Sequence, residues 1–297
     1  MAGPFREIPR ASAASILAVV AWLVLGAVSV RAQPAKDPRE AQPERPTVAT
    51  HAYAVAPGIV ELETGMQWQS LGPASAQLTG PVLVKVGLAR RLQLDIAPGW
   101  AWLGPDGARH GGSADTAVGL KWQVAVGLPL LADVAVQSTV KLPTGDVGRG
   151  TGTGTTDLNL VFISSRQLGK VEVDVNFGYT RRSGDGTLAP TTATLWTVST
   201  GFLVTGPLSW AAELFGYPGT RGPAGSRPIV AILTGPTFQP QRSVVLDAGL
   251  ILNVEGFGAT ALYAGVTWNI GRLPGFNRST PERTAGANPF PAHAFPR

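Results

Sequence analysis

The sequence contains no cysteine, and this absence excludes several kinds of site. Disulfide bonds, a catalytic thiol, a zinc site with cysteine ligands and a lipid-anchored N-terminal cysteine are all impossible. Histidine is nearly as scarce, since the chain has only His51, His110 and His293. None of the three lies in a segment with a strand-like pattern, so neither a Ser-His-acid triad nor a cluster of histidine metal ligands can be assembled on rigid elements.

Enzymatic activity is therefore not expected, and neither is a cofactor or a metal ion. One hydrolase candidate exists, because His110 is close in sequence to Ser113 and Asp115. The glycine-rich loop at 148–156 invites comparison with a phosphate-binding loop. It lacks the Gly-Lys-Ser or Gly-Lys-Thr ending of such a loop and no helix follows it, so we interpret it as a surface loop.

Charge is also sparse, at 14% of the residues, with a formal net charge of +5. The arginines are scattered over predicted loops and are not massed on one face, so no nucleic-acid partner is expected. Glycine and proline are abundant, at 37 and 25 residues, and helical periodicity is missing from residue 58 onward. This composition favours a single all-β unit.

The N-terminus has the features of a secretory signal peptide. Arg6 and Arg10 form a basic region, residues 15–30 are apolar, and Val30-Arg31-Ala32 has small residues at the positions that a signal peptidase reads. We expect residues 1–32 to be removed. The alternative is a single transmembrane anchor, because the apolar run approaches the length that crosses a bilayer of ~30 Å. Residues 33–57, with five prolines, are predicted to form a Pro-rich periplasmic linker that packs no core.

Between residues 58 and 271 apolar and polar residues alternate with a period of two, as in strands with one apolar and one polar face. The segment from Lys170 to Arg181 is typical: Val171, Val173, Val175, Phe177 and Tyr179 alternate with polar residues. Twelve strands are predicted, at 59–70, 77–89, 92–103, 116–126, 131–142, 157–166, 170–181, 192–205, 208–217, 228–238, 243–254 and 260–270. Most have ten residues or more, which suits a tilted strand that crosses a membrane.

The connections alternate between tight turns and long polar loops. ARR, GLPL, QLGK, TGPL and QPQR are short, whereas the segments after the third, fifth, seventh and ninth strands are long. Transmembrane barrels have short periplasmic turns and longer external loops. Aromatic residues gather near both ends of the strands, as in the two girdles at the membrane interfaces. The sequence therefore predicts a twelve-stranded antiparallel transmembrane β-barrel of the outer-membrane type, followed by a disordered Pro-rich tail at 272–297.

The polar face of each strand would then line the lumen of the barrel. Charged residues on this face are predicted to be lumen-lining, and they are Glu61, Glu63, Lys85, Asp95, Lys121, Asp133, Lys141, Asp157, Glu172, Asp174, Glu213 and Asp247. Such charges would be very costly in the dry core of a soluble sandwich but are tolerated in a wet or salt-bridged lumen. Two interpretations remain open: a ladder that guides a solute, or cross-strand pairs that hold a narrow barrel together.

The stretch KLPTGD at residues 141–146, followed by GTGTGTTD ending at Asp157, resembles the signature of a bacterial family of outer-membrane transporters. This family is named for the MetA pathway of phenol degradation, and VDVNFGYTRRSGD at residues 173–185 extends the resemblance. It implies an exported barrel of the bacterial outer membrane that takes up aromatic or other hydrophobic compounds. A departure is the extension beyond the last strand, since such barrels usually end there with an aromatic residue.

These observations predict a barrel for passive passage or binding of small, hydrophobic or aromatic compounds. Its partners would be outer-membrane lipid, a small-molecule solute and, during biogenesis, the barrel-assembly machinery. One alternative is a structural or surface-interaction barrel without transport, and another is an outer-membrane hydrolase that depends on His110.

Overall fold

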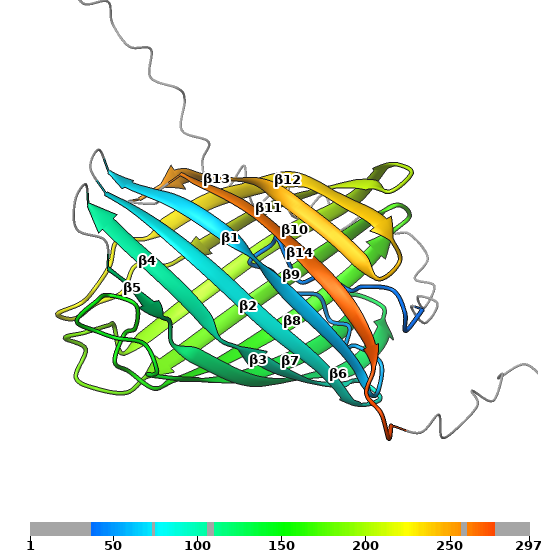
Figure 1. Ribbon diagram of the computed structural model, residues 1–297, viewed down its shortest axis with the longest axis horizontal. Helices are drawn as coiled ribbons and strands as arrows, with labels where there is room; N and C mark the ends of the chain where they lie inside the picture. Colours follow the sequence, from blue (N-terminus) through cyan, green and yellow to red (C-terminus); the bar gives the residue numbers. More distant parts are fainter. Residues whose placement is uncertain (1–36, 73–74, 106–109, 257–259, 277–297) are drawn as a thin grey trace, which may run out of the picture.

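The computed structural model describes residues 37–72, 75–105, 110–256 and 260–276, which form a closed antiparallel β-barrel (Figure 1). Each strand pairs with its neighbours, and β1 pairs with both β2 and β14, which closes the ring. The strand segments are β1 Ile59–Gly72, β2 Ser75–Ala89, β3 Leu92–Ala97, β4 Gly99–Pro105, β5 His110–Ser113, β6 Thr116–Leu128, β7 Ala132–Leu142, β8 Asp157–Leu168, β9 Val171–Arg182, β10 Thr192–Thr205, β11 Leu208–Tyr217, β12 Ile229–Gln241, β13 Val244–Glu255 and β14 Ala261–Arg272.

The prediction of twelve strands is confirmed, because two of the strands are each divided into two segments. β3 and β4 are separated at Pro98, and both pair with β2. β5 and β6 are separated at Ala114 and Asp115, where β5 pairs with β4 and β6 pairs with β3. Proline has no N–H to donate to the ladder, so a sheet is readily interrupted beside it.

One detail of the prediction was wrong. The part of the third connection that forms β5 was placed in a loop, but it is an added strand segment on the outer end of the fourth strand. The sequence did not predict this segment because His110-Gly-Gly-Ser113 has no alternation of apolar and polar side chains. His110 and Ser113 are three residues apart on a strand and so point to opposite faces, which does not favour a catalytic pair.

The outward face of the barrel is a broad apolar belt. Leu158, Leu160 and Phe162 on β8 are exposed, as are Phe177 and Tyr179 on β9. The same holds around the ring, where Trp122 is 58% exposed and Trp268 48% exposed. Soluble monomers rarely present apolar patches larger than a few hundred Å². A belt on every face of the ring therefore requires an apolar surrounding.

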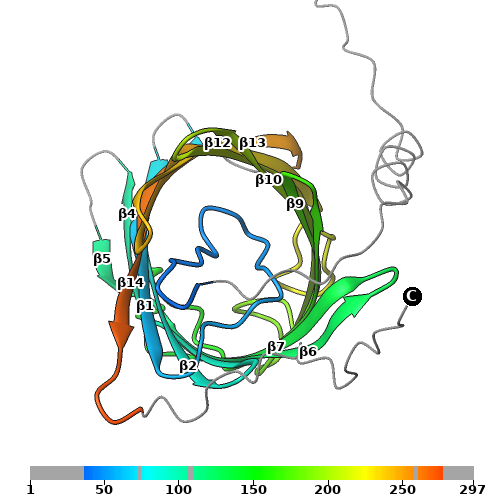
Figure 2. The ribbon, with the colours of Figure 1, turned by 90° about the vertical axis from the view of Figure 1, so that its right-hand side faces the viewer.

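The segment from residue 37 to residue 57, here called the arm, lies inside the ring of strands (Figure 2). This corrects the prediction for residues 33–57, because the described part of that segment packs against the inner wall and is not an external linker. Ala49, Ala52 and Val55 of the arm are fully buried or nearly so. The prolines of the arm misled the sequence analysis: they prevent regular secondary structure, but they do not prevent an extended chain from packing.

Some predictions fall outside the described residues. The predicted signal peptide at 1–32 lies there, and so does all but the first five residues of the predicted tail at 272–297. The part of the chain that the structure describes contains no helix long and apolar enough to cross a membrane.

Candidate functional site

The arm lies inside the lumen, where the wall holds it mainly through side-chain acceptors. The N–H of Gln42 donates to both carboxylate oxygens of Glu61, and the N–H groups of Glu44 and Arg45 donate to Glu63. Farther along the arm, Val48 and Ala49 both donate to Glu213, each at 2.7 Å. Hydrogen bonds to carboxylates are among the stronger ones in proteins. Three predicted lumen carboxylates therefore serve to bind the backbone of the arm.

Neutral side chains of the wall continue the same arrangement. The N–H of Thr50 donates to Asn176 on β9, and the Asn176 amide donates back to the carbonyl of Thr50. The N–H of Ala52 donates to the hydroxyl of Ser165 on β8, and the N–H of Val55 donates to Gln93 on β3. The acceptors come from strands on different sides of the ring, so the arm spans its cross-section (Figure 2).

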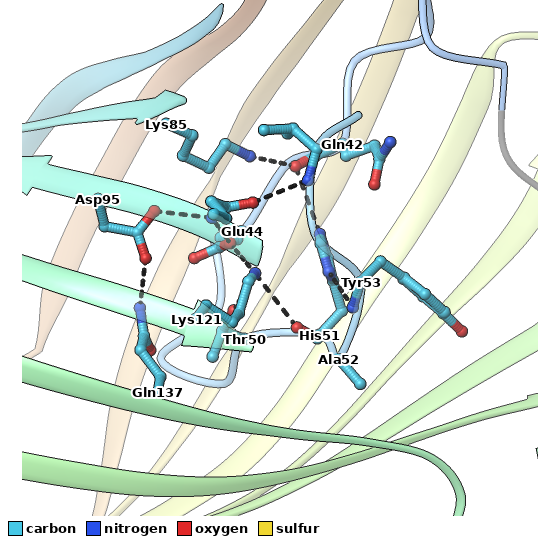
Figure 3. A network of polar contacts seen from close by, with 12 residues as sticks. Gln42, Glu44, Thr50, His51, Ala52, Tyr53, Lys85, Asp95, Lys121 and Gln137 are labelled. Atoms are coloured by element: carbon cyan, nitrogen blue, oxygen red, sulfur yellow. Dashed lines mark hydrogen bonds and ion pairs between the residues drawn. The ribbon is translucent and has the colours of Figure 1, made fainter. Parts of the chain in front are cut away.

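Two buried lysines of the wall point at the arm (Figure 3). The Nζ of Lys85 lies 3.0 Å from Glu61 and 2.6 Å from Glu63, and it also donates to the carbonyl of Gln42. Lys121 pairs with Glu44 of the arm and donates to the carbonyl of His51 at 3.3 Å. A buried ion that loses its partner is strongly destabilising. The arm supplies partners for both lysines, so the wall and the arm depend on each other.

A further ion pair joins Arg45 of the arm to Asp247 on β13, at 3.4 Å. The guanidinium lies against Gly65 and Gly265, which face each other across β1 and β14. A Cβ on Gly265 would lie 2.6 Å from the Nε of Arg45, and a Cβ on Gly65 would lie 2.7 Å from a terminal nitrogen. These glycines thus make the space that the arginine occupies. Gly87 does the same for the arm backbone at Val55 and Ala56.

Four more of the predicted lumen residues lie on the wall, and three of them contact other residues of the wall. Asp95 accepts from Gln93 and Gln137, Asp133 accepts from the N–H of Gly127, and Asp174 accepts from Ser165. Glu172 is half-buried on β9. The contacts of the three aspartates link strands and turns of the wall to one another.

A separate cluster lies toward the outer end, where the long loops begin. Asp157 lies 3.4 Å from Lys141 and 3.1 Å from Arg182. Asp115, at the interruption between β5 and β6, accepts from Lys141 at 2.7 Å and from the N–H groups of Gly145 and Thr153. The KLPTGD stretch and the Gly/Thr run are therefore folded over this end of the barrel.

Sequence reasoning missed several residues that hold the arm. Glu44 and Arg45 were missed because the arm was interpreted as a linker. Gln93, Asn176 and Ser165 were missed because only charged residues were selected. The alternation that identified the charges places these three on the same inward face, so the signal was available.

One part of the inner wall is apolar. Phe215 on β11, Ala231 and Leu233 on β12 and Tyr263 on β14 form a buried cluster. Val48 of the arm packs against this apolar wall, as does Ile251 on β13. Gly235 and Gly249 make room for the Tyr263 phenol, since a Cβ on either would lie within 2.7 Å of its oxygen. The lumen therefore combines a polar region that holds the arm with an apolar region on β11–β14.

The fold matches that of a solved outer-membrane protein. A crystal structure of an outer membrane channel from Pseudomonas putida F1 aligns with 73% of this chain and 97% of its own, with a TM-score of 0.62 and 12% sequence identity. The CymD monoaromatic hydrocarbon channel aligns with 72% of this chain and 89% of its own, with a TM-score of 0.41 and 9% identity. At these identities the first similarity establishes the fold, and the second adds nothing to it. No family model and no curated protein match the sequence.

The described residues contain no group of three or more His, Asp or Glu side chains arranged to hold a metal ion. The described part of the lumen thus contains polar side chains that hold the arm and, next to them, a buried apolar cluster against which Val48 of the arm packs.

Proposed function

We propose that the protein is a channel of the bacterial outer membrane that binds and passes small hydrophobic compounds, aromatic ones included, and that it is not an enzyme. The apolar wall inside the lumen carries this proposal. Phe215, Leu233, Ile251 and Tyr263 make part of the inner face apolar beside Val48 of the arm, which is the kind of surface that an apolar solute can contact when the arm moves. Ligand sites for hydrophobic molecules are lined by such side chains, with few polar groups to fix orientation.

The placement in the outer membrane rests on independent features. The outward belt is apolar around the ring. The turns at one end are short and the loops at the other are long, as in barrels of this membrane. A signal peptide at residues 1–32 would export the chain, and the barrel-assembly machinery would insert it. The resemblance of KLPTGD and the Gly/Thr run to the family named for the MetA pathway agrees with this assignment.

The arm limits what can pass. Because the arm is bound inside the ring, we propose that the barrel is not an open water channel of the porin type and that passage requires the arm to shift. The predicted lumen charges then act mainly by holding the arm, and they select solutes only through it. This favours the structural interpretation of the charges over a solute-guiding ladder.

The test is uptake of an aromatic hydrocarbon and of a small sugar by Gram-negative cells that lack their major porins and express the protein. Faster hydrocarbon uptake with unchanged sugar uptake is expected. Phe215→Ser should reduce hydrocarbon uptake, whereas Leu188→Ser, on an exposed outer loop, should leave it unchanged. No gain of uptake for either solute would favour the structural barrel without transport, and the proposal would fail.

A further inference from the structure

Cations stand at the inner ends of three strands, close to the lipid-facing residues. On β8 the outward series Leu158, Leu160 and Phe162 continues through Ser164 to Arg166. Arg90 and Arg242 directly follow β2 and β12, and both are exposed. On β14 a register shift places Arg272 opposite the buried Ile59, so Arg272 faces the mouth of the lumen and does not belong to this set. We call Arg90, Arg166 and Arg242 the inner basic rim.

The inner turns carry no acid to balance this rim. Their charged residues are Arg90 and Arg91 after β2, Lys170 after β8 and Arg242 after β12, all positive. The turns after β6 and β10 have no charge. At the edge of the arm, Asp37 pairs with Arg39 at 2.8 Å and with Arg242 at 3.3 Å. This carboxylate offsets part of the charge at Arg242, and the other rim cations lie on different strands.

A backbone contact holds one of the rim arginines near the wall, since Arg166 donates to the carbonyl of Leu130 in the neighbouring turn at 3.4 Å. Arginine has five donors, so a guanidinium can hold a backbone carbonyl and bind a phosphate at the same time.

The rim lies just beyond the inner aromatic residues Trp122, Trp210, Phe238 and Trp268, all of which are exposed. Aromatic residues of this kind settle at the level of the lipid headgroups. The register of the strands places Leu92, which follows Arg90 and Arg91, opposite Trp122. The rim cations are therefore at headgroup depth, where the phosphates of the inner leaflet are.

We infer that the inner basic rim binds anionic phospholipids of the inner leaflet, with arginine guanidinium groups on the lipid phosphates. This inference depends on the proposed placement in the outer membrane. The apolar residues above the rim would contact the acyl chains, and the rim cations would select a headgroup of net negative charge over a zwitterionic one. Each cation near an anionic membrane surface contributes about a fivefold preference.

The experiment uses the full chain in nanodiscs made of phosphatidylcholine with a quarter phosphatidylglycerol. The lipids that remain on the protein after release are counted by native mass spectrometry. The bound lipids of the natural protein should be enriched in phosphatidylglycerol. Arg90→Gln with Arg166→Gln should reduce the enrichment by about fivefold for each cation removed. The matched control is Arg221→Gln with Arg227→Gln, which removes the same charge from an exposed outer loop and should change nothing.

Bound lipid that mirrors the nanodisc composition would overturn the inference, and so would an equal loss in the control. Neither result would by itself refute the proposed placement in the outer membrane. That placement stands if the barrel still inserts and still runs faster on a gel before boiling than after. Failure of the natural protein to insert into any bilayer would instead refute the proposed function. If phosphatidylglycerol is still enriched in the variant with both rim arginines replaced, the rim is not the lipid site and the inference fails. The rim cations would then be available to an acidic periplasmic protein instead.

Discussion

Changing Glu213 to Gln should release the arm from the wall. Glu213 is buried on β11 and accepts hydrogen bonds from the N–H groups of Val48 and Ala49, both at 2.7 Å. A glutamine of the same shape has one neutral acceptor, and its NH₂ group would face the second N–H. Hydrogen bonds to charged groups contribute about 1.5–3 kcal/mol each, against about 1 kcal/mol for neutral ones. We expect arm docking to weaken by about 2–3 kcal/mol.

The absence of natural cysteine makes a direct assay possible. Ala52 is fully buried on the arm, and the substitution Ala52→Cys creates the only site that a maleimide can label. In the docked state the new thiol is covered by Ala135, Val161 and Ile163, so the labelling rate measures how often the arm leaves. A weakening of about 2–3 kcal/mol corresponds to labelling that is about 30-fold to 150-fold faster.

The matched control is Asp133→Asn, which removes a buried lumen carboxylate that accepts from Gly127 in a wall turn and not from the arm. It should leave the labelling rate at position 52 nearly unchanged. Unchanged labelling in the Glu213→Gln variant would refute the reasoning. So would equal acceleration in both variants, because the effect would then come from general loosening of the barrel.

Three further predictions use the same protein. Gly265→Val should weaken arm docking by about 1–3 kcal/mol in the labelling assay, since the new side chain overlaps Arg45, whereas Gly201→Val, which meets open space, should not. Val175→Arg should destabilise the barrel by about 2–4 kcal/mol in urea unfolding from lipid vesicles if it faces the bilayer midplane, and Val147→Arg, on an outer loop, should cost little. Hydrogen bonds from Arg39 hold the pKa of Asp37 well below its ordinary value despite some desolvation. Because the pKa of Asp37 is lower in the folded protein than in the unfolded chain, where it is near 3.8, ionised Asp37 stabilises the folded state. This stabilisation is fully present above the unfolded pKa and is lost only as the pH falls through the folded pKa. The rate of maleimide labelling at position 52 should therefore show no step attributable to Asp37 between pH 8 and pH 5, roughly the range in which carboxylates of ordinary pKa stay ionised. An acid-induced rise of the rate in this range that Asp37→Asn abolishes would contradict the prediction.

The sequence predicted the fold best where one local rule, the alternation of side chains along a strand, applies to every residue. Alternation along a strand depends only on neighbouring residues, because successive side chains point to opposite faces. It identified the twelve strands and the inward side of Glu61, Glu63 and Glu213. It failed at β5, where His110-Gly-Gly-Ser113 has no pattern, and at Pro98, where an interrupted strand looks like one continuous run.

The partners of the lumen residues could not be predicted in the same way. Val48 and Glu213 are 165 residues apart, and Gln42 and Glu61 come from segments that were assigned to different parts of the molecule. The excess of acids on the inward face was visible in the sequence, but its cause was not. The partners of these carboxylates are backbone N–H groups. Nearly every residue has one, so the sequence does not show which of them bind a carboxylate.

The sequence by itself determined the all-β class, the apolar outward face, the polar inward face and the asymmetry between short turns and long loops. These features follow from local chemistry repeated along the chain. Only the tertiary structure decided that the arm lies inside the lumen, that glycines at 65 and 265 make room for Arg45, and that an apolar wall faces inward on β11–β14. Each of these depends on closing the ring, because closure brings distant segments together in a confined space whose shape no single strand encodes.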